Sequence, residues 1–426
     1  MYDSVFGNSK FQNTLPLFLF SFYSMSLLNC LSNQSVWIQY FEYKVQNGYL
    51  GKDEAQDLFL FIRNQEYIGI LNKITAKGIS TPCKKQIQKI DSTKKREVYT
   101  FPKEENYILK LLTYLVIRKY DGIFSSNLYS FRVNYNVKQA FQHILSTPNI
   151  NQYYTYKVDI SNYFNSIDLN ILLPRLRNVL HDDVPLYEFI EALLRNPLVI
   201  ENDEIKQEQK GIMAGCPIAA FLANVYLSDL DKMFAEEQMI YCRYSDDIII
   251  FTKTKEEQER IKQKLFTILE SYHLTLNTKK EISTSSNEPW TFLGLKYDTE
   301  KIDISDIALK KIKAKMRRKT RALIRWKNIK NKEPIYAVKA FINAFNKKFY
   351  NNTDVHDMTW ARWYFPLITT DRNLRAIDQY MQECIRYIAT EKHTKSKYNF
   401  RYDQMKEFGY QSLVNNWYKN KKTIKS

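Results

Sequence analysis

The stretch that most constrains the fold of this chain is Arg243-Tyr244-Ser245-Asp246-Asp247-Ile248-Ile249-Ile250, where two adjacent aspartates separate two short apolar runs. The flanking residues favour β-strands, so the pattern predicts a β-hairpin whose turn carries both acids. Successive strand residues point to opposite faces, and two neighbouring carboxylates therefore converge on one site only at a turn. Paired carboxylates of this kind suit Mg²⁺ and phosphoryl transfer, whereas a solvated Asp-Asp turn is the alternative interpretation.

The net charge of +17 is concentrated in the last third of the chain. Residues 301–426 contain 29 Lys and Arg against 11 Asp and Glu, whereas residues 1–300 contain 34 against 35. A segregated basic lobe is typical of a protein that binds a nucleic-acid backbone. A generally basic surface is the alternative, but it would spread the charge along the chain.

The length of the chain and its cysteines indicate how many lobes it forms and in which compartment it works. A chain of 426 residues predicts two or three lobes. The five cysteines form no C-x-x-C pair and have no zinc-site spacing. We therefore expect buried thiols, a reducing compartment and a cytoplasmic location.

The N-terminal segment carries no charged residue from Phe11 to Phe41. A membrane segment or signal peptide is one interpretation. Pro16 and the serines and asparagines dilute its hydropathy, so we expect a buried or partner-facing segment and no membrane association. Met25 is an alternative start, which leaves open whether residues 1–24 belong to the native protein.

The chain outside the hairpin predicts an α+β architecture, with an antiparallel sheet and helices on one face. Hydrophobic periodicity predicts helices over 35–75, 105–119, 137–145, 170–196, 217–237 and 254–269, and again after Asp306. Strand patterns fall at 97–102, 153–159, 274–276 and 290–297. The strand at 153–159 ends in a single acid, Asp159.

Three acids on two separated strands, Asp159 with Asp246 and Asp247, are what a two-metal polymerase site requires. Taken with the order of elements, the chain resembles a reverse transcriptase over most of residues 85–426. Tyr244-Ser245-Asp246-Asp247 matches the Y-x-D-D signature of that family. Further motifs resemble its first catalytic strand, its template loop and helix, its lysine motif and its primer grip, at residues 157–164, 210–227, 276–280 and 292–294.

The resemblance implies a right-hand polymerase with fingers, a palm built on an antiparallel sheet with helices, and an all-helical basic thumb. Its lobes would be an N-terminal helical segment (1–84), fingers (85–150), palm (151–300, with finger and palm helices at 165–210), and thumb with C-terminal extension (301–426).

The same resemblance implies the roles of individual residues. Asp159, Asp246 and Asp247 would be catalytic and would bind two Mg²⁺ ions together with the backbone carbonyl of Ile160. The primer grip would be Phe292, Leu293 and Gly294. Phe164 would be the sugar gate that excludes a 2′-hydroxyl. Nucleotide binding would involve Arg96, Arg132, Phe164, Lys280, Ala214 and Gly215, with Lys279 competing for the role of Lys280.

Within the family, the chain looks most like bacterial group II intron and retron enzymes of the defence-associated, abortive-infection type, partly through the run from Trp360 to Thr369. This implies an RNA-directed DNA polymerase in anti-phage defence that uses dNTPs to copy a dedicated structured non-coding RNA into cDNA. Ala214 replaces the family's usual Gln, and Ala219-Ala220 its Ser-Pro. Because alanine cannot hydrogen-bond as Gln does, untemplated or protein-primed synthesis stays open. A non-catalytic RNA-binding scaffold is the alternative of another class, and the oligomeric state is left undetermined.

Overall fold

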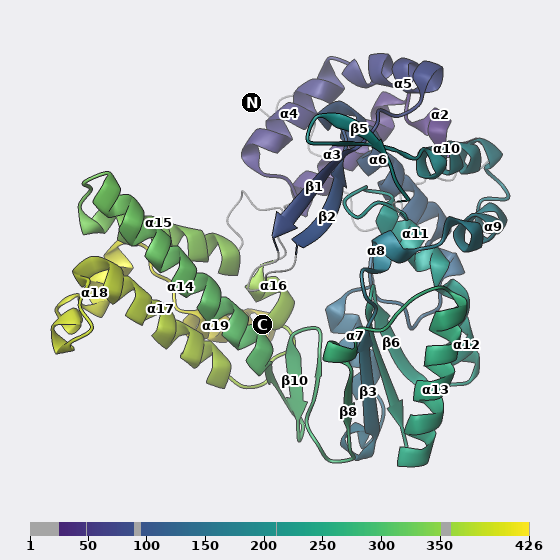
Figure 1. The fold of residues 1–426 in the computed structure, drawn as a ribbon. Coiled ribbons are helices and arrows are strands. Elements are labelled where there is room, and N and C mark those ends of the chain that lie inside the picture. Colours follow the sequence, from purple (N-terminus) through teal and green to yellow (C-terminus); the bar gives the residue numbers. More distant parts are fainter. Residues whose placement is uncertain (1–24, 48, 89–94, 210, 351–358, 426) are drawn as a thin grey trace.

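The computed structural model describes residues 25–47, 49–88, 95–209, 211–350 and 359–425. Its described part is arranged as a right hand (Figure 1), with fingers above the palm and a helical thumb beside them. The predicted α+β class and right-hand architecture are confirmed. Residues 1–24, which include Phe11 to Ser24 of the uncharged segment, lie outside the described residues, as do residues 89–94. Within the described residues, no helix is both long and apolar enough to cross a membrane.

The N-terminal part is helical, as the periodicity of residues 35–75 predicts. Trp37 is fully buried, stacked on Tyr67 at 5.2 Å between ring centroids and edge-on to Phe61 at 5.5 Å. This aromatic core fixes how the four short helices pack. They are α2 (Leu27–Cys30), α3 (Gln34–Gln46), α4 (Lys52–Arg63) and α5 (Glu66–Lys77).

The fingers contain a four-stranded sheet of order β2-β1-β4-β5. Its strands are β1 (Cys83–Gln88), β2 (Lys95–Thr100), β4 (Leu198–Glu201) and β5 (Glu204–Gln207). β1 pairs antiparallel with β2 and parallel with β4, at Cys83 and Ile200. The β4–β5 hairpin was not predicted from the sequence. In the structure its two-residue turn is formed by Asn202 and Asp203, which both take the left-handed conformation that such a turn requires.

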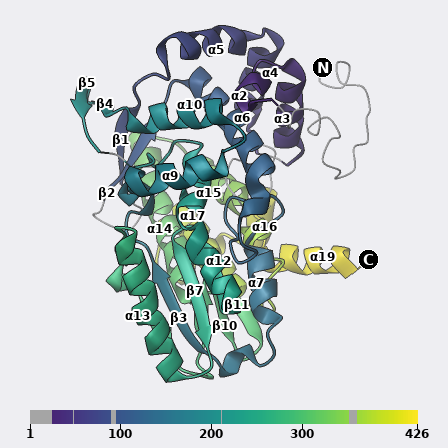
Figure 2. The same cartoon turned by 90° about the vertical axis from the view of Figure 1, so that its right-hand side faces the viewer.

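Helices surround the fingers and the upper palm (Figure 2). The helix predicted over 217–237 is divided at Leu227, whose ψ of 15° leaves the α-helical range. The helices in this part are α6 (Lys103–Tyr120), η1 (Asp121–Ile123), α7 (Val137–Leu145), η2 (Ile150–Gln152), α8 (Tyr163–Ser166), α9 (Leu169–Val179), α10 (Val184–Arg195), α11 (Ala219–Tyr226) and α12 (Ser228–Glu236).

The palm sheet has the order β6-β7-β3-β8 and is antiparallel throughout. Its strands are β3 (Tyr154–Asp159), β6 (Ile240–Tyr244), β7 (Asp247–Thr252) and β8 (Ile282–Thr284). One face packs on α11, α12 and α13 (Lys255–Ser271), whose N-terminus is capped by Thr254 as its sequence predicts.

Two sequence predictions about the palm are wrong. Helices cover both faces of the sheet, because α7 packs with Cys242, Ile249 and Phe251 on the second face. Residues 274–276 form no strand: Leu276 makes only an isolated bridge to Ile160, since the chain turns at once into η3 (Thr278–Lys280).

A small antiparallel sheet connects the palm to the thumb. It consists of β9 (Trp290–Phe292), β10 (Leu295–Asp298) and β11 (Lys301–Ile304), and Trp290 stacks on Tyr297 within it. The described part of the thumb is helical, as predicted after Asp306. Its helices are α14 (Asp306–Ile329), α15 (Pro334–Phe349), α16 (Trp360–Tyr364), α17 (Arg372–Thr390), η4 (Lys395–Asn399), α18 (Tyr402–Glu407) and α19 (Leu413–Lys425).

All five cysteines are free thiols, in agreement with their spacing. Four of them are buried and Cys83 is half-buried.

Candidate active site

Strand register brings the three predicted acids together at the open end of the palm sheet. Asp159, the last residue of β3, pairs directly with Asp247, the first residue of β7, so both side chains lie on the same face. Asp246 occupies the turn between β6 and β7, where Ser245 has a φ of 60°. The carbonyl of Asp246 accepts a hydrogen bond of 3.0 Å from the Ile160 amide, which ties the turn to the end of β3.

The carboxylates crowd negative charge into a poorly solvated place. Burial raises the pKa of Asp246 to about 6, with further contributions from Asp247 and Asp159. Burial also raises the pKa of Asp247, against the opposing effect of the Lys157 ammonium, which lies 3.8 Å from its carboxylate. Two raised pKa values on adjacent acids indicate a site that is short of positive charge.

Asp159 has two partners from the loop after α13. The Lys280 ammonium forms an ion pair with its Oδ1, and Asn277 donates to its Oδ2 at 3.3 Å. Lys280 therefore reaches the acids, and the structure gives no such contact to its rival Lys279. Within the described ranges, no three acidic, His or Cys side chains are arranged to hold a metal ion as they stand.

The acid-bearing turn rests on a buried loop and a buried ion pair. The Ser245 amide donates to the hydroxyl of Ser130 at 2.8 Å. Beneath the turn, Arg243 makes a bidentate pair with Asp231 of α12, at 2.8 and 2.5 Å, and donates to the Ser245 carbonyl at 3.3 Å. Both charged side chains are fully buried. The geometry of the turn is thus set from below by groups that do not face the cleft.

The predicted template loop is fixed between α8 and β2. A side chain on Gly211 would come within 2.6 Å of the Phe164 carbonyl, and one on Gly215 within 2.7 Å of the Tyr99 carbonyl. Ala214 is buried; its amide donates to Asn165 Oδ1 at 3.0 Å and its carbonyl accepts from the Tyr99 amide at 2.8 Å. Ala214 therefore acts on its surroundings through its backbone.

Phe164 is half-buried, edge-on to Phe131 at 6.4 Å and to Tyr163 at 5.8 Å. It lies five residues after Asp159, and its carbonyl is close to Gly211. Arg96 lies exposed on β2, opposite Ile87 of β1.

Arg132 has a structural environment. Only 4% of its side chain is exposed, and it makes a bidentate pair with Asp121 at 3.0 Å for each bond. It also donates to the Ser125 carbonyl at 2.6 Å. These contacts hold the loop that carries Ser130 and support a positioning role for Arg132; its nucleotide-binding role stays a prediction.

The predicted primer-grip residues form the tight turn between β9 and β10. Phe292 is fully buried against Phe141, whereas Leu293 and Gly294 form the turn itself and are half-buried.

Sequence reasoning gave no role to several side chains that contact the predicted site residues, among them Lys157, Asn165 and Asn277. Lys157 lies two residues before Asp159 in β3, so strand alternation alone places it on the same face. Asn277 stands inside a motif in which only the lysines received a role. Nothing in the local sequence marks Asn165, because its partner Ala214 is distant in the chain.

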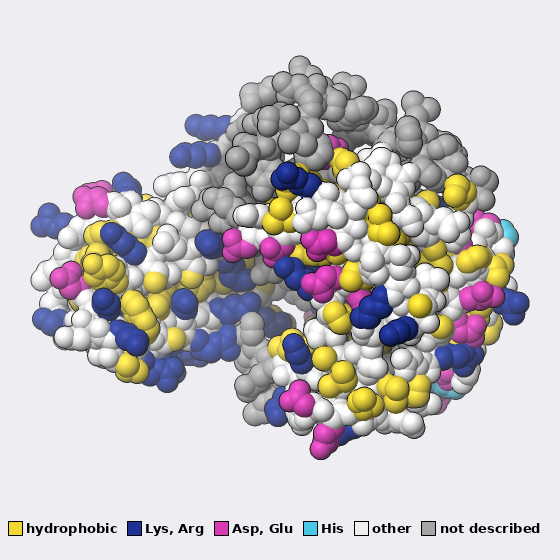
Figure 3. All heavy atoms as spheres, turned by 90° about the horizontal axis from the view of Figure 1, so that it is seen from above, with side chains coloured by type: hydrophobic (Ala, Val, Ile, Leu, Met, Phe, Trp, Pro, Cys, Tyr) yellow, Lys and Arg dark blue, Asp and Glu magenta, His cyan; other side chains and the backbone are white. Residues whose placement is uncertain are grey.

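Many of the Lys and Arg residues in the last third of the chain lie on one thumb helix, α14. α14 alone carries ten Lys and Arg and one acid. Lys311 of this helix is near enough to lower the pKa of Asp247, although burial raises it more. Viewed from above, Lys and Arg side chains gather along the thumb where it borders a hollow (Figure 3). At least one lysine of the basic helix, Lys311, thus lies near the acids.

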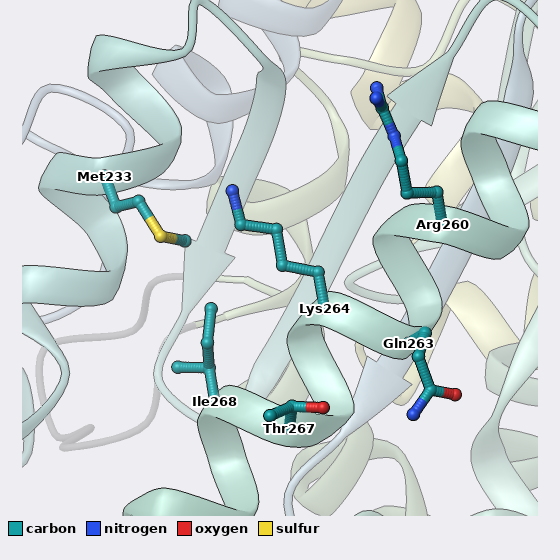
Figure 4. A pocket seen from close by; sticks show the side chains of 6 residues that line it. All are labelled: Met233, Arg260, Gln263, Lys264, Thr267 and Ile268. Atoms are coloured by element: carbon teal, nitrogen blue, oxygen red, sulfur yellow. The ribbon is translucent and has the colours of Figure 1, made fainter.

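A separate depression of about 660 Å³ lies between α12 and α13 (Figure 4). It is lined by Met233, Arg260, Gln263, Lys264, Thr267 and Ile268, and contains no predicted site residue.

The family model for "Reverse transcriptase (RNA-dependent DNA polymerase)" matches residues 83–297. The retron Ec86 reverse transcriptase of Escherichia coli is 25% identical over 175 residues, which cover 40% of this chain and 51% of that protein. The chain thus matches about half the length of this relative.

Telomerase structures are similar at lower identity. Telomerase from Candida tropicalis, in complex with a TWJ fragment of telomeric RNA, has 14% identity and a TM-score of 0.45, covering 79% of this chain and 67% of that one. The corresponding Candida albicans complex has 12% identity and a TM-score of 0.42, covering 76% and 64%.

Proposed function

Because this chain belongs to the reverse transcriptase (RNA-dependent DNA polymerase) family, we propose that it is an RNA-directed DNA polymerase. The observation that carries the proposal is the convergence of three acids, through the register of Asp159 with Asp247 and the turn at Asp246. Nucleotidyl transfer needs a site of this kind, in which fixed carboxylates hold cations and the cations balance the negative charge of the phosphates.

The donor set fits Mg²⁺. The three carboxylates are hard oxygen ligands, and the raised pKa of Asp246, due to burial and its acidic neighbours, reflects uncompensated negative charge. Asp159, Asp246, Asp247 and the Ile160 carbonyl would hold two ions. When bound, Mg²⁺ would activate a primer 3′-hydroxyl and stabilise charge on the α-phosphate.

The surrounding residues have distinct proposed tasks. Lys280 and Lys157 supply positive charge beside the acids, and Lys280, which is 57% exposed, is accessible to a triphosphate. Arg96 on the exposed strand β2 suits bidentate binding of phosphate oxygens. Phe164, which is half-buried against Phe131 and Tyr163, would exclude a ribose 2′-hydroxyl. Gly215 and the backbone of Ala214 would line the nucleotide site.

We propose that the template is a dedicated structured non-coding RNA and the product its cDNA, held by the basic thumb. The retron relative and the charge of α14 support an RNA partner. The C-terminal run from Trp360 supports a role in anti-phage defence in a cytoplasmic setting. Ala214 favours one competing mode, untemplated or protein-primed synthesis, because its short buried side chain gives a template no hydrogen bond.

Sequencing the nucleic acids made and retained by the purified protein tests this proposal. We expect DNA complementary to a co-purified RNA when Mg²⁺ and dNTPs are supplied. DNA that matches no bound RNA, or DNA linked to a tyrosine of the protein, would replace templated copying by the competing mode. Absence of any DNA product would favour the non-catalytic scaffold. Plaque counts in cells carrying the gene with its flanking non-coding region report on the defence role separately.

A further inference from the structure

The short helix α16 connects three parts of the molecule beside the acids. It lies between the thumb and the fingers in Figure 1. Its N-cap Thr359 is buried and its first residue, Trp360, packs edge-on against Phe349 of α15 at 5.7 Å. On its outer side, Arg362 donates to the carbonyl of Asn47, the C-cap of α3, at 3.0 Å. α16 is therefore anchored in the thumb and also bound to the N-terminal helices.

The inner side of α16 contacts the turn between β9 and β10. The indole N–H of Trp363 donates to the Leu293 carbonyl at 3.0 Å. The next residue, Tyr364, lies so close that a side chain on Gly294 would come within 2.5 Å of its hydroxyl. Two consecutive residues of α16 thus press on two consecutive residues of the turn.

This turn needs external support. Leu293 has a φ of 49° and Gly294 one of 83°, so both take the left-handed conformation of a two-residue hairpin loop. Glycine adopts it freely, but a leucine there is strained, because its Cβ crowds the backbone. A hydrogen bond to the carbonyl of the strained residue stabilises the conformation that leucine alone would avoid.

Trp363 also contacts Tyr244, the first residue of the Y-x-D-D motif. Its ring meets the Tyr244 ring edge-on, with centroids 5.9 Å apart. Tyr244 pairs with Asp247 across the β6–β7 hairpin. One side chain therefore contacts both the turn at the predicted primer-grip position and the β6 residue that pairs with Asp247.

We propose that Trp363 is a positioning residue for the primer terminus, which holds the Leu293–Gly294 turn and Tyr244 at a fixed separation. The inference rests on the proposed function. The basic thumb would bind the nucleic-acid backbone nonspecifically, whereas placement of a 3′-hydroxyl against an α-phosphate depends on rigid surrounding residues. Trp363 makes the Leu293–Gly294 turn and Tyr244 rigid through one hydrogen bond and one ring contact.

The test compares Trp363→Phe, which removes the N–H and keeps an aromatic ring, with Trp360→Phe on the same helix. Both tryptophans are half-buried, but Trp360 packs toward the thumb. Rapid-quench extension of a primer–template separates the burst rate from the burst amplitude. We expect Trp363→Phe to lower the burst rate about tenfold at unchanged amplitude, with less than about a twofold change in primer–template affinity. Trp360→Phe should keep the wild-type rate.

A rescue variant ties the effect to the turn. Leu293→Asn creates an Asn-Gly pair, which favours this turn without outside support. Added to Trp363→Phe, it should restore slow amide hydrogen exchange at residues 292–295, a readout that does not depend on Leu293 as a primer-grip side chain. An unchanged rate in Trp363→Phe, a loss of amplitude instead of rate, or a double variant whose turn exchanges as fast as in Trp363→Phe would each overturn the assignment.

The outcome is separable from that of the proposed function. A wild-type protein that extends no primer would refute the polymerase assignment alone. Amide hydrogen exchange at residues 292–295 then still tests whether Trp363 holds the turn, with exchange about two- to tenfold faster expected in Trp363→Phe. Unaltered exchange would overturn the inference whatever the enzyme does.

Discussion

Two groups of charged side chains lie on opposite sides of the β6–β7 turn, and they differ in how their charge is balanced. Below the turn, Arg243 and Asp231 are fully buried and neutralise each other in a bidentate pair. The Tyr241 hydroxyl also donates a hydrogen bond to Asp231, at 2.8 Å. Above it, Asp246 and Asp247 have raised pKa values, because burial and neighbouring acids disfavour their charged forms.

The difference teaches which group serves stability and which serves chemistry. Burial alone would lower the pKa of Arg243, but the Asp231 carboxylate raises it, so this pair stays charged and complete. Despite neighbouring lysines, the pKa values of Asp246 and Asp247 stay raised, which supports the proposal that these acids bind added Mg²⁺. The balanced Arg243–Asp231 pair holds the turn in place.

The largest expected effect is on the unbalanced side. Changing Asp246→Ala together with Asp247→Ala should reduce DNA synthesis at least about 10³-fold, since it removes the groups that would hold the cations. Bound RNA should still co-purify, and thermal stability should not fall, because like charges are removed. A matched control is Asp203→Ala with Glu204→Ala, an exposed acidic pair at the β4–β5 turn. Primer extension measures the result, and synthesis equal to the control would refute the site.

The balanced side predicts a loss of stability. Asp231→Ala leaves the Arg243 guanidinium buried without its partner, and we expect about 3–5 kcal/mol less free energy of unfolding. Asp229→Ala on the same helix removes an exposed partner of Arg175, 3.1 Å away, and should cost less than about 1 kcal/mol. Urea unfolding compares the two. Equal losses would show that the buried pair does not support the turn as described.

The smallest effect is a pH dependence of stability in the metal-free protein. Between the ordinary Asp pKa of 3.8 and the value of about 6 that burial gives Asp246, the unfolded chain has released a proton that the folded protein retains. The contribution of Asp246 to the free energy of unfolding is therefore fully present below this pH window. It falls as pH rises through the window, by on the order of 2 kcal/mol. Unfolding in EDTA at pH 4 and pH 7 checks this.

Asp246→Asn should flatten that slope, whereas Asp203→Asn, at an exposed turn, should leave it unchanged. A slope that persists in Asp246→Asn would place the titrating group elsewhere.

Much of the fold was predictable because its signals are local. The acid-bearing hairpin, the strand ending at Asp159 and the capped helix after Thr254 each follow from a few adjacent residues. What failed depends on tertiary partners: α7 covers the second palm face, and residues 274–276 leave their predicted strand. The break at Leu227 is equally invisible in a continuous apolar pattern.

The site divides in the same way. The sequence motifs identified the three acids, and the structure brings them together as expected. Lys280, one of two adjacent lysines, was distinguished from Lys279 only by its contact with Asp159. The partner of Arg132, Asp121, is eleven residues earlier and carries no motif. The nucleotide-binding roles of Arg96, Arg132, Lys280, Ala214 and Gly215 remain predictions, as do the sugar gate Phe164 and the primer grip.

The pairing of β1 with β4 has a consequence for how the chain is made. Cys83 and Ile200 are neighbours in one sheet, yet the strand that carries Asp159 is synthesised between them. During translation the β1–β2 hairpin must therefore keep an open edge until β4 has emerged, which happens after the first strand of the palm. A fragment that ends before β4 would expose that edge to aggregation.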